Sequence, residues 1–81
     1  MKKSMSLDEL SNGSKARVIA LRGGREFQHR IQSMGLSMGS EISVMQNNSD
    51  EGEQGGVVVR VGDTRLMIGH GMAQKVVVRV E

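Results

Sequence analysis

Apolar residues alternate with polar ones in several short stretches of the chain. The alternation covers residues 15–21, 41–46 and 75–80, which is typical of strands that bury one face. Residues 57–68 form two apolar runs around Gly62-Asp63, and glycine at the first position of a two-residue loop favours a type II′ hairpin turn. The pattern therefore predicts five strands, two of which form this hairpin.

The predicted turn fixes the register of the hairpin. One face carries six residues, five of them apolar: Val57, Val59, Val61, Thr64, Leu66 and Ile68. The opposite face carries two apolar and two basic side chains: Val58, Met67, Arg60 and Arg65. Like charges that face each other, as Arg60 and Arg65 do in this register, destabilise a sheet unless acidic groups offset them. Glu41 and Glu81 are candidate neighbours within the chain, and an acidic partner is the other source of compensation.

Between the first two predicted strands the period changes to that of a helix. Phe27, Ile31 and Met34 are spaced at i, i+4 and i+7, which predicts an amphipathic helix of about two to three turns. Gly35 follows at the position that a left-handed capping residue takes. Leu36 is then placed to pack back on the last turn of this helix.

A second, shorter helical signal precedes the first strand. Ser6 and Glu9 fit a capping box, in which each residue bonds the backbone N–H of the other. Leu7 and Leu10 then share one face of a single turn. We expect this turn to lay the two leucines over one end of the core.

The remaining segments complete one domain. Residues 1–5 are expected to be a flexible N-terminus, and residues 6–81 a single domain. The polar, glycine-rich stretch 47–56 is interpreted as a mobile hairpin loop, and 69–73 as a tight turn. Five short strands with tight corners, and one helix between the first two, predict a mainly β fold, a small five-stranded SH3-like barrel.

Composition narrows the classes of function. The 81 residues contain no cysteine, which excludes a disulfide framework, a thiolate zinc site and a cysteine nucleophile, and favours the cytoplasm. No apolar run approaches the roughly 20 residues that cross a bilayer, so no direct membrane insertion is expected. Phe27 is the single aromatic residue, and the net charge is only +2. Both facts argue against nucleic-acid binding, which relies on stacking platforms and strong positive charge.

The sequence holds no recognisable catalytic motif. His29 and His70 are the available neutral bases, and neither lies in a known nucleophile motif. The run Gly13-Ser14-Lys15 lacks the upstream glycine of a phosphate-binding loop. We therefore predict a protein that is not an enzyme and has no catalytic or cofactor-binding residues.

Potential metal ligands are few and scattered. Glu26 and His29 share a helix, His70 lies in a turn, and three acidic residues gather in one loop: Asp50, Glu51 and Glu53. That loop lacks the spacing of an EF-hand, although an acidic loop can hold a divalent cation such as Fe²⁺ weakly. We predict no metal site, and keep weak binding of Fe²⁺ or another divalent metal as an alternative.

The ordered set of motifs resembles a known family. The resemblance runs from about Leu7 to Val80 and rests mainly on Arg22-Gly23-Gly24, Arg30-Ile31-Gln32-Ser33-Met34-Gly35-Leu36 and Leu66-Met67-Ile68-Gly69. In this order the motifs resemble the FeoA-like family, small SH3-like domains associated with ferrous iron transport. One departure is Met38, where the family usually has proline before the glycine that Gly39 matches.

The resemblance implies a cytoplasmic accessory protein with regulatory function. The implied partner is FeoB, the membrane ferrous iron transporter, which carries a cytosolic GTPase domain. The same domain type lies at the C-terminal end of some iron-dependent repressors, so a metal-sensing interaction module is an alternative. A nucleic-acid-binding small barrel ranks last, and a homodimer through exposed apolar residues is a further alternative.

Exposed apolar residues beside charged ones are the usual composition of a binding hot spot. The partner-binding residues expected on this ground come from the helix with its exit turn and from the outer hairpin face: Arg25, Arg30, Leu36, Met38, Val58, Arg60, Arg65 and Met67.

Overall fold

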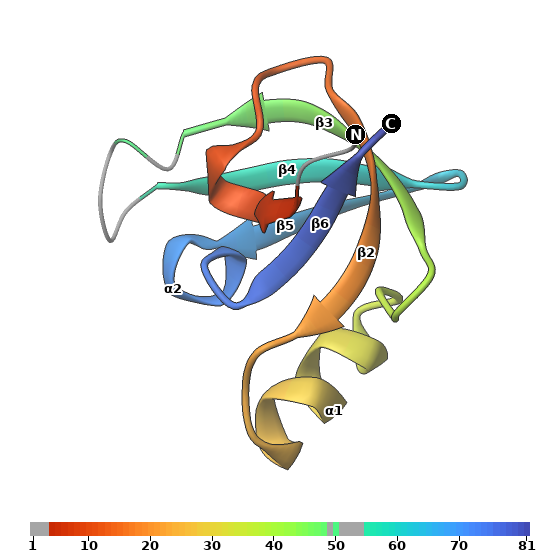
Figure 1. Ribbon diagram of the computed structural model, residues 1–81, viewed down its shortest axis with the longest axis vertical. Helices are drawn as coiled ribbons and strands as arrows, with labels where there is room; N and C mark the ends of the chain where they lie inside the picture. The colour runs from red at the N-terminus through yellow and green to blue at the C-terminus, as the bar shows by residue number, and fades with distance from the viewer. Residues whose placement is uncertain (1–3, 49, 51–54) are drawn as a thin grey trace.

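A computed structural model describes residues 4–48, 50 and 55–81 of the protein. Strands and short helices follow one another as β1 (Ser4–Ser6), the 3₁₀ helix η1 (Leu7–Glu9), β2 (Lys15–Leu21), α1 (Arg25–Ser33), β3 (Glu41–Asn47), β4 (Gly56–Val61), β5 (Thr64–Gly69), α2 (His70–Ala73) and β6 (Val76–Val80). Within the described residues, all strands belong to one antiparallel sheet in the order β1-β6-β2-β3-β4-β5 (Figure 1). The sheet curls around the core, consistent with an SH3-like fold.

The expected count of five strands is wrong, because the described sheet has six. The additional strand is β1, which pairs with β6 and lies partly in the stretch assigned to a flexible terminus; residues 1–3 lie outside the described residues. Three residues are too short for a periodic signal, although Met5 packs against the core. The segment 69–73, expected to be a tight turn, contains the one-turn helix α2. The longer helix α1 therefore lies between β2 and β3, not between the first two strands of the sheet.

The hairpin of β4 and β5 has the predicted register. Val61 pairs with Thr64, and the pairing continues without interruption to Gly56 and Gly69. Gly62 has a φ of 60°, whereas Asp63 has no positive φ. A positive φ at the first central residue alone is the signature of a type II′ turn, so the turn type is also confirmed.

Two bulges interrupt the simple alternation elsewhere. The register between β2 and β6 shifts between Val18 and Ala20, and the register between β3 and β4 shifts between Val44 and Gln46. Each bulge inserts one unpaired residue and increases the local twist, which helps a small sheet to curl. In β3 the inserted residue is Met45, whose side chain is exposed.

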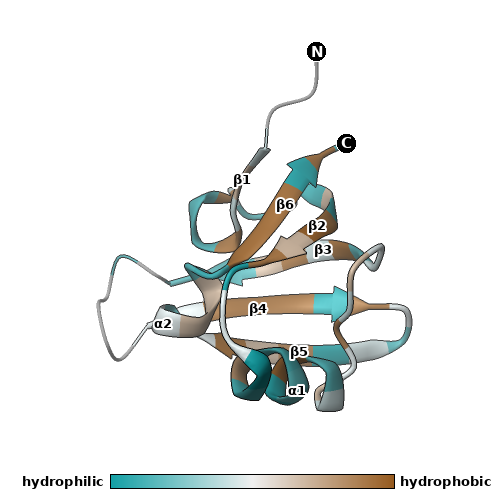
Figure 2. Ribbon diagram, turned by 60° about the horizontal axis from the view of Figure 1, so that its bottom comes forward, coloured by the Kyte–Doolittle hydropathy of each residue, from teal (hydrophilic) through white to brown (hydrophobic). Residues whose placement is uncertain are grey.

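The core lies inside the curled sheet, and its buried side chains are all apolar among the described residues. Figure 2 shows much of the strands in the colour of hydrophobic residues. Leu7 and Leu10 both belong to the core, so the predicted burial of the two leucines is confirmed. The glutamate of the capping box accepts a bond from the Ser6 N–H at 3.3 Å. The buried side chains are Leu7, Leu10, Ala16, Val18, Ile31, Leu36, Ile42, Val44, Val57, Val59, Ile68, Ala73, Val76 and Val78.

Helix α1 ends in a Schellman motif. The Leu36 N–H donates to the Ile31 carbonyl at 3.2 Å, and the Gly35 N–H donates to the Gln32 carbonyl at 3.0 Å. Gly35 has a φ of 104°, which is the left-handed conformation that this motif requires. Ile31 and Leu36 are both fully buried, so the cap also closes a hydrophobic contact in the core.

Replacing Gly35 by alanine should destabilise the protein by about 1 kcal/mol, because alanine is strained in the left-handed region. A Cβ at Gly35 would meet no atom within 4 Å, so the backbone conformation alone sets this cost. Gly71→Ala is the matched control. Gly71 lies inside α2 and also has open space around it, so this variant should be slightly more stable than the wild type. Urea unfolding curves measure the stability of both variants. Equal stability would contradict the left-handed capping role of Gly35.

Candidate functional site

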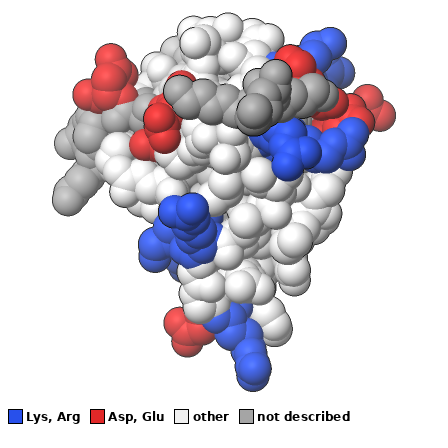
Figure 3. All heavy atoms as spheres, viewed as in Figure 1, with Lys and Arg blue, Asp and Glu red and all other residues white. Residues whose placement is uncertain are grey.

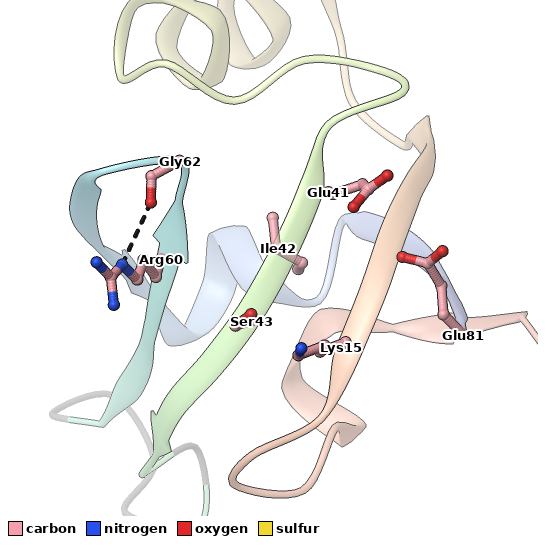
Figure 4. Close-up of a pocket in the computed structure, with 7 residues that line it drawn as sticks. All are labelled: Lys15, Glu41, Ile42, Ser43, Arg60, Gly62 and Glu81. Carbon is pink, nitrogen blue, oxygen red and sulfur yellow. Dashed lines mark hydrogen bonds between the residues drawn. The ribbon is translucent and has the colours of Figure 1, made fainter.

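Four polar side chains form a row across the outer face of four neighbouring strands. Lys15 of β2 pairs with Ser43 of β3, Ser43 pairs with Arg60 of β4, and Arg60 pairs with Arg65 of β5. Figure 4 shows the first three members following one another over β2, β3 and β4. We call these four residues the basic row. The sequence predicted only its Arg60–Arg65 part.

A shallow hollow of about 360 Å³ lies over the inner part of this row. It is lined by residues of β2, β3 and β4, by the hairpin turn and by the last residue: Lys15, Glu41, Ile42, Ser43, Arg60, Gly62 and Glu81 (Figure 4). Basic and acidic groups therefore border the same hollow. Which of them are already paired within the protein decides which charges can bind a ligand.

The two acidic groups are engaged by Arg17 on the neighbouring part of β2. Its guanidinium lies 2.5 Å from the Glu41 carboxylate and 3.9 Å from the Glu81 carboxylate, and it also donates to the Gly39 carbonyl. Glu41 and Glu81, the candidate acidic neighbours of the hairpin arginines, pair with Arg17 instead, because strand pairing places Arg17 directly opposite Glu41.

The basic row has no acidic partner among the residues that the structure describes. The Nε of Arg60 donates to the Gly62 carbonyl at 3.2 Å, which is a bond to a neutral group. Within the described residues, no carboxylate lies within ion-pair distance of Lys15, Arg60 or Arg65. Three cations in one row without a described counter-charge favour an anionic group of a partner.

Exposed methionines lie along one side of the basic row. Met67 of β5 is 63% exposed, and Met45, in the bulge of β3, is 41% exposed. Val58 lies between them in the sheet, paired with Met67, and is half-buried. Large, flexible apolar side chains beside arginine are well suited to bind a protein surface.

Helix α1 provides a second surface. Arg25 and Arg30 are exposed on it, and Figure 3 shows basic side chains over the end of the molecule where Figure 1 places α1. A groove of about 450 Å³ is lined by Glu26, Phe27, Arg30, Met72 and Lys75. The Lys75 Nζ lies 5.5 Å from the centroid of the Phe27 ring, which is within the range of a cation–π contact.

The expected partner-binding residues do not form one site. Leu36 was expected on the surface, but it is fully buried, because the Schellman motif turns it into the core. Met38, in the turn after α1, is 65% exposed. Helix α1, which carries Arg25 and Arg30, lies below the sheet in Figure 1, whereas the hairpin turn lies at its right-hand side. The structure thus separates two surfaces and removes one of the eight expected contacts.

The potential metal ligands remain scattered in the described part of the chain. His29 is exposed on α1, and His70 begins α2 with its Nε2 3.1 Å from the Gln74 amide nitrogen. Asp50 is exposed, while Glu51 and Glu53 of the acidic loop lie outside the described residues. Among the residues that the structure describes, no three or more His, Asp or Glu side chains gather in a way that could hold a metal ion.

The repulsion between Arg60 and Arg65 gives a testable prediction. At low salt, Arg65→Gln should stabilise the hairpin by removing the repulsion, and Arg65→Glu should stabilise it further, by about 0.5 kcal/mol, through an opposite-charge pair with Arg60. The differences should shrink in 1 M salt, because salt screens exposed charges. Urea unfolding at two salt concentrations measures the series. Identical midpoints for all three proteins at low salt would show that the repulsion is absent.

These features define a class of protein: a small, mainly β domain with an SH3-like fold that presents open surfaces. The sequence model of the FeoA domain matches residues 5–80, and the chain therefore belongs to the FeoA domain family. The predicted resemblance to FeoA-like domains is thereby confirmed. No curated protein sequence matches the chain significantly.

Solved structures agree with this assignment. The chain is similar to the crystal structure of an iron uptake regulatory protein (FeoA), with 32% identity, a TM-score of 0.84, and coverage of 98% of this chain and 99% of the other. It is also similar to a FeoA-like protein from Clostridium acetobutylicum, with 25% identity, a TM-score of 0.79, and coverage of 99% and 90%. Both similarities extend over nearly whole chains, so they concern the complete described fold.

The fold also occurs as part of a longer protein. A manganese-dependent transcriptional repressor matches with a TM-score of 0.85 at 17% identity, where the alignment covers 100% of this chain and 44% of the repressor. At this identity the similarity concerns the fold alone. In the described part of the chain, no helix has the length and apolar character needed to cross a membrane.

Proposed function

We propose that this protein is a non-enzymatic regulatory module of bacterial ferrous iron uptake that acts in the cytoplasm. It docks on the cytosolic side of a FeoB-type membrane iron transporter. Membership of the FeoA family and the similarity to a protein named as an iron uptake regulator support the role. The docking proposal rests mainly on the basic row, for which the described residues supply no counter-charge, and on the exposed Met67 beside it.

The shape of the described surface supports binding over catalysis. The hollow over the basic row is open to solvent, whereas small-molecule sites enclose most of their ligand. In the described residues, the ring of His70 forms a hydrogen bond with the Gln74 side-chain amide, and no serine hydroxyl is paired with a histidine. An activated nucleophile needs such a base within hydrogen-bond reach.

Metal sensing is the second candidate and has less support. The manganese-dependent repressor shares only the fold with this chain. Saturable binding of Fe²⁺ that shifts the His29 or His70 resonances would favour it. Unshifted histidine resonances at saturating Fe²⁺ or Mn²⁺ would remove sensing through these side chains.

The docking proposal is tested by titrating the ¹⁵N-labelled protein with the cytosolic part of FeoB, with and without guanine nucleotide. We expect localised shifts on β4 and β5, on α1, or on both surfaces. Two double variants then separate the surfaces with the same change in net charge: Arg60→Glu with Arg65→Glu, and Arg25→Glu with Arg30→Glu. Absence of any shift at high concentration of the transporter fragment would overturn docking on its cytosolic side.

A further inference from the structure

In the described sheet, the β5 strand is an open edge. The strand order places β5 last, with β4 on one side. Apart from β4, the described element that approaches β5 most extensively is α2, which follows it directly in the chain. An edge strand offers a row of backbone N–H and C=O groups to another extended chain.

The register identifies the backbone groups that are free. Val61 and Thr64 flank the two-residue turn and form a hydrogen-bonded pair, so the bonded pairs continue at every second residue. The N–H and C=O groups of Arg65 and Met67 consequently point away from β4. Within the described residues, neither residue makes a backbone hydrogen bond outside the sheet ladder.

The usual protections of an edge are largely missing from β5. Natural edges carry proline, a bulge, inward-pointing charge or several lysines. The six residues of β5 are Thr-Arg-Leu-Met-Ile-Gly, with no proline and one charged side chain, Arg65. Their pairing with β4 shows no bulge. A regular, accessible edge of this kind fits strand addition by a partner.

Side chains next to this edge specify the chemistry of the partner. A strand added beside β5 would lie about 4.8 Å away, so one of its outward side chains would face Arg65 and extend the basic row by one position. A carboxylate there would supply the counter-charge that the described residues lack. Two residues along the same strand, an apolar side chain would face Met67.

We propose that the free edge of β5 binds an extended segment of a partner protein by strand addition. The segment places an acidic side chain opposite Arg65 and an apolar side chain opposite Met67. The inference rests on the proposed docking function and specifies its contact. A second copy of this chain fits less well, because β5 contains no acidic residue and two copies would leave both basic rows without counter-charge.

The direct test uses a blocked peptide, Thr-Glu-Val-Leu-Thr, as the probe. Its saturating addition should slow amide hydrogen exchange of Arg65 and Met67 by about tenfold or more, with little change at Leu66, whose N–H already bonds β4. Two control peptides carry Lys in place of Glu, or N-methyl groups on alternate backbone nitrogens. If the N-methylated peptide binds as well as the parent peptide, the contact does not use backbone bonds and the inference fails.

A pair of variants tests the edge in the protein itself. Met67→Pro removes the outward N–H without removing a bond to β4, whereas Met67→Thr shortens the side chain and keeps the N–H. Binding of the peptide should be lost in Met67→Pro and largely kept in Met67→Thr. The peptide controls decide the inference if Met67→Pro fails to fold.

The cytosolic part of the transporter separates this inference from the proposed function. If it binds wild type and Met67→Pro equally, strand addition at β5 is wrong and the proposed docking on the transporter stands. If it does not bind wild type but the acidic peptide does, docking on the transporter is wrong and strand addition at β5 stands. A dimer in sedimentation experiments that dissociates in Met67→Pro would show that a second copy occupies the edge, and would overturn the proposed occupant.

Discussion

Replacing Gly56 by alanine is expected to destabilise the protein by about 2–3 kcal/mol, which is a large share of the stability of a domain this small. A Cβ at Gly56 would lie 2.7 Å from the Ile68 carbonyl oxygen. That oxygen belongs to the backbone of the paired strand, so it cannot move aside as a flexible side chain would. Gly56 therefore allows β4 and β5 to approach closely at the end of the hairpin away from its turn.

Gly69 supplies the matched control, because it pairs directly with Gly56 across the same two strands. A Cβ at Gly69 would meet no atom within 4 Å, so Gly69→Ala should change stability by less than about 0.5 kcal/mol. Urea unfolding with both variants measures the difference. Similar losses in the two variants would mean that general sensitivity of the hairpin end, and not the close approach at Gly56, sets the cost.

The hairpin shows how much of the fold could be predicted from the sequence. Its turn, register and buried face follow from two local signals that agree, the Gly62-Asp63 dipeptide and strict alternation on both sides. The C-terminal cap of α1 is equally local, because Gly35 and Leu36 take their positions from the last turn of the same helix. Features whose partners are near in sequence were therefore predictable.

The candidate site depends on pairings between distant segments, which the sequence does not specify. Lys15 joins Ser43 and Arg60 only because β2 pairs with β3 across the intervening helix and loop. The same pairing places Glu41 beside Arg17, so Glu41 forms an ion pair with Arg17 and not with Arg60 or Arg65. The bulge that exposes Met45 is a feature of the pairing of β3 with β4, so it could not be located from residues 41–47 alone.

Leu36 illustrates a different limit. The sequence supported two readings, a residue that packs back on α1 and an exposed apolar contact for a partner. The two readings compete for one side chain, and burial in the core removes more apolar area from water than a surface contact does. The Schellman motif favours the first reading on physical grounds, because its hydrophobic contact joins this position to Ile31.

Ile31→Ala is expected to destabilise the protein by about 3 kcal/mol, and Ile31→Val by about 1 kcal/mol, because removed methyl groups leave a cavity in a packed core. Ile31 is the one buried residue of α1. Its loss should therefore weaken the attachment of α1 more than the sheet. Amide exchange should become faster throughout residues 25–33 while residues 57–61 keep more of their protection.

The partner-binding surfaces should respond differently to the same change. The basic row belongs to the sheet, so contacts at Arg60 and Arg65 should survive in Ile31→Ala under conditions where the sheet stays folded. Contacts that use Arg25 and Arg30 should weaken, because these residues are positioned by α1. Titration of Ile31→Ala and Ile31→Val with the cytosolic part of the transporter compares the two surfaces. If exchange in α1 and in β4 rises equally, α1 unfolds only together with the sheet, and its attachment does not depend on this one side chain.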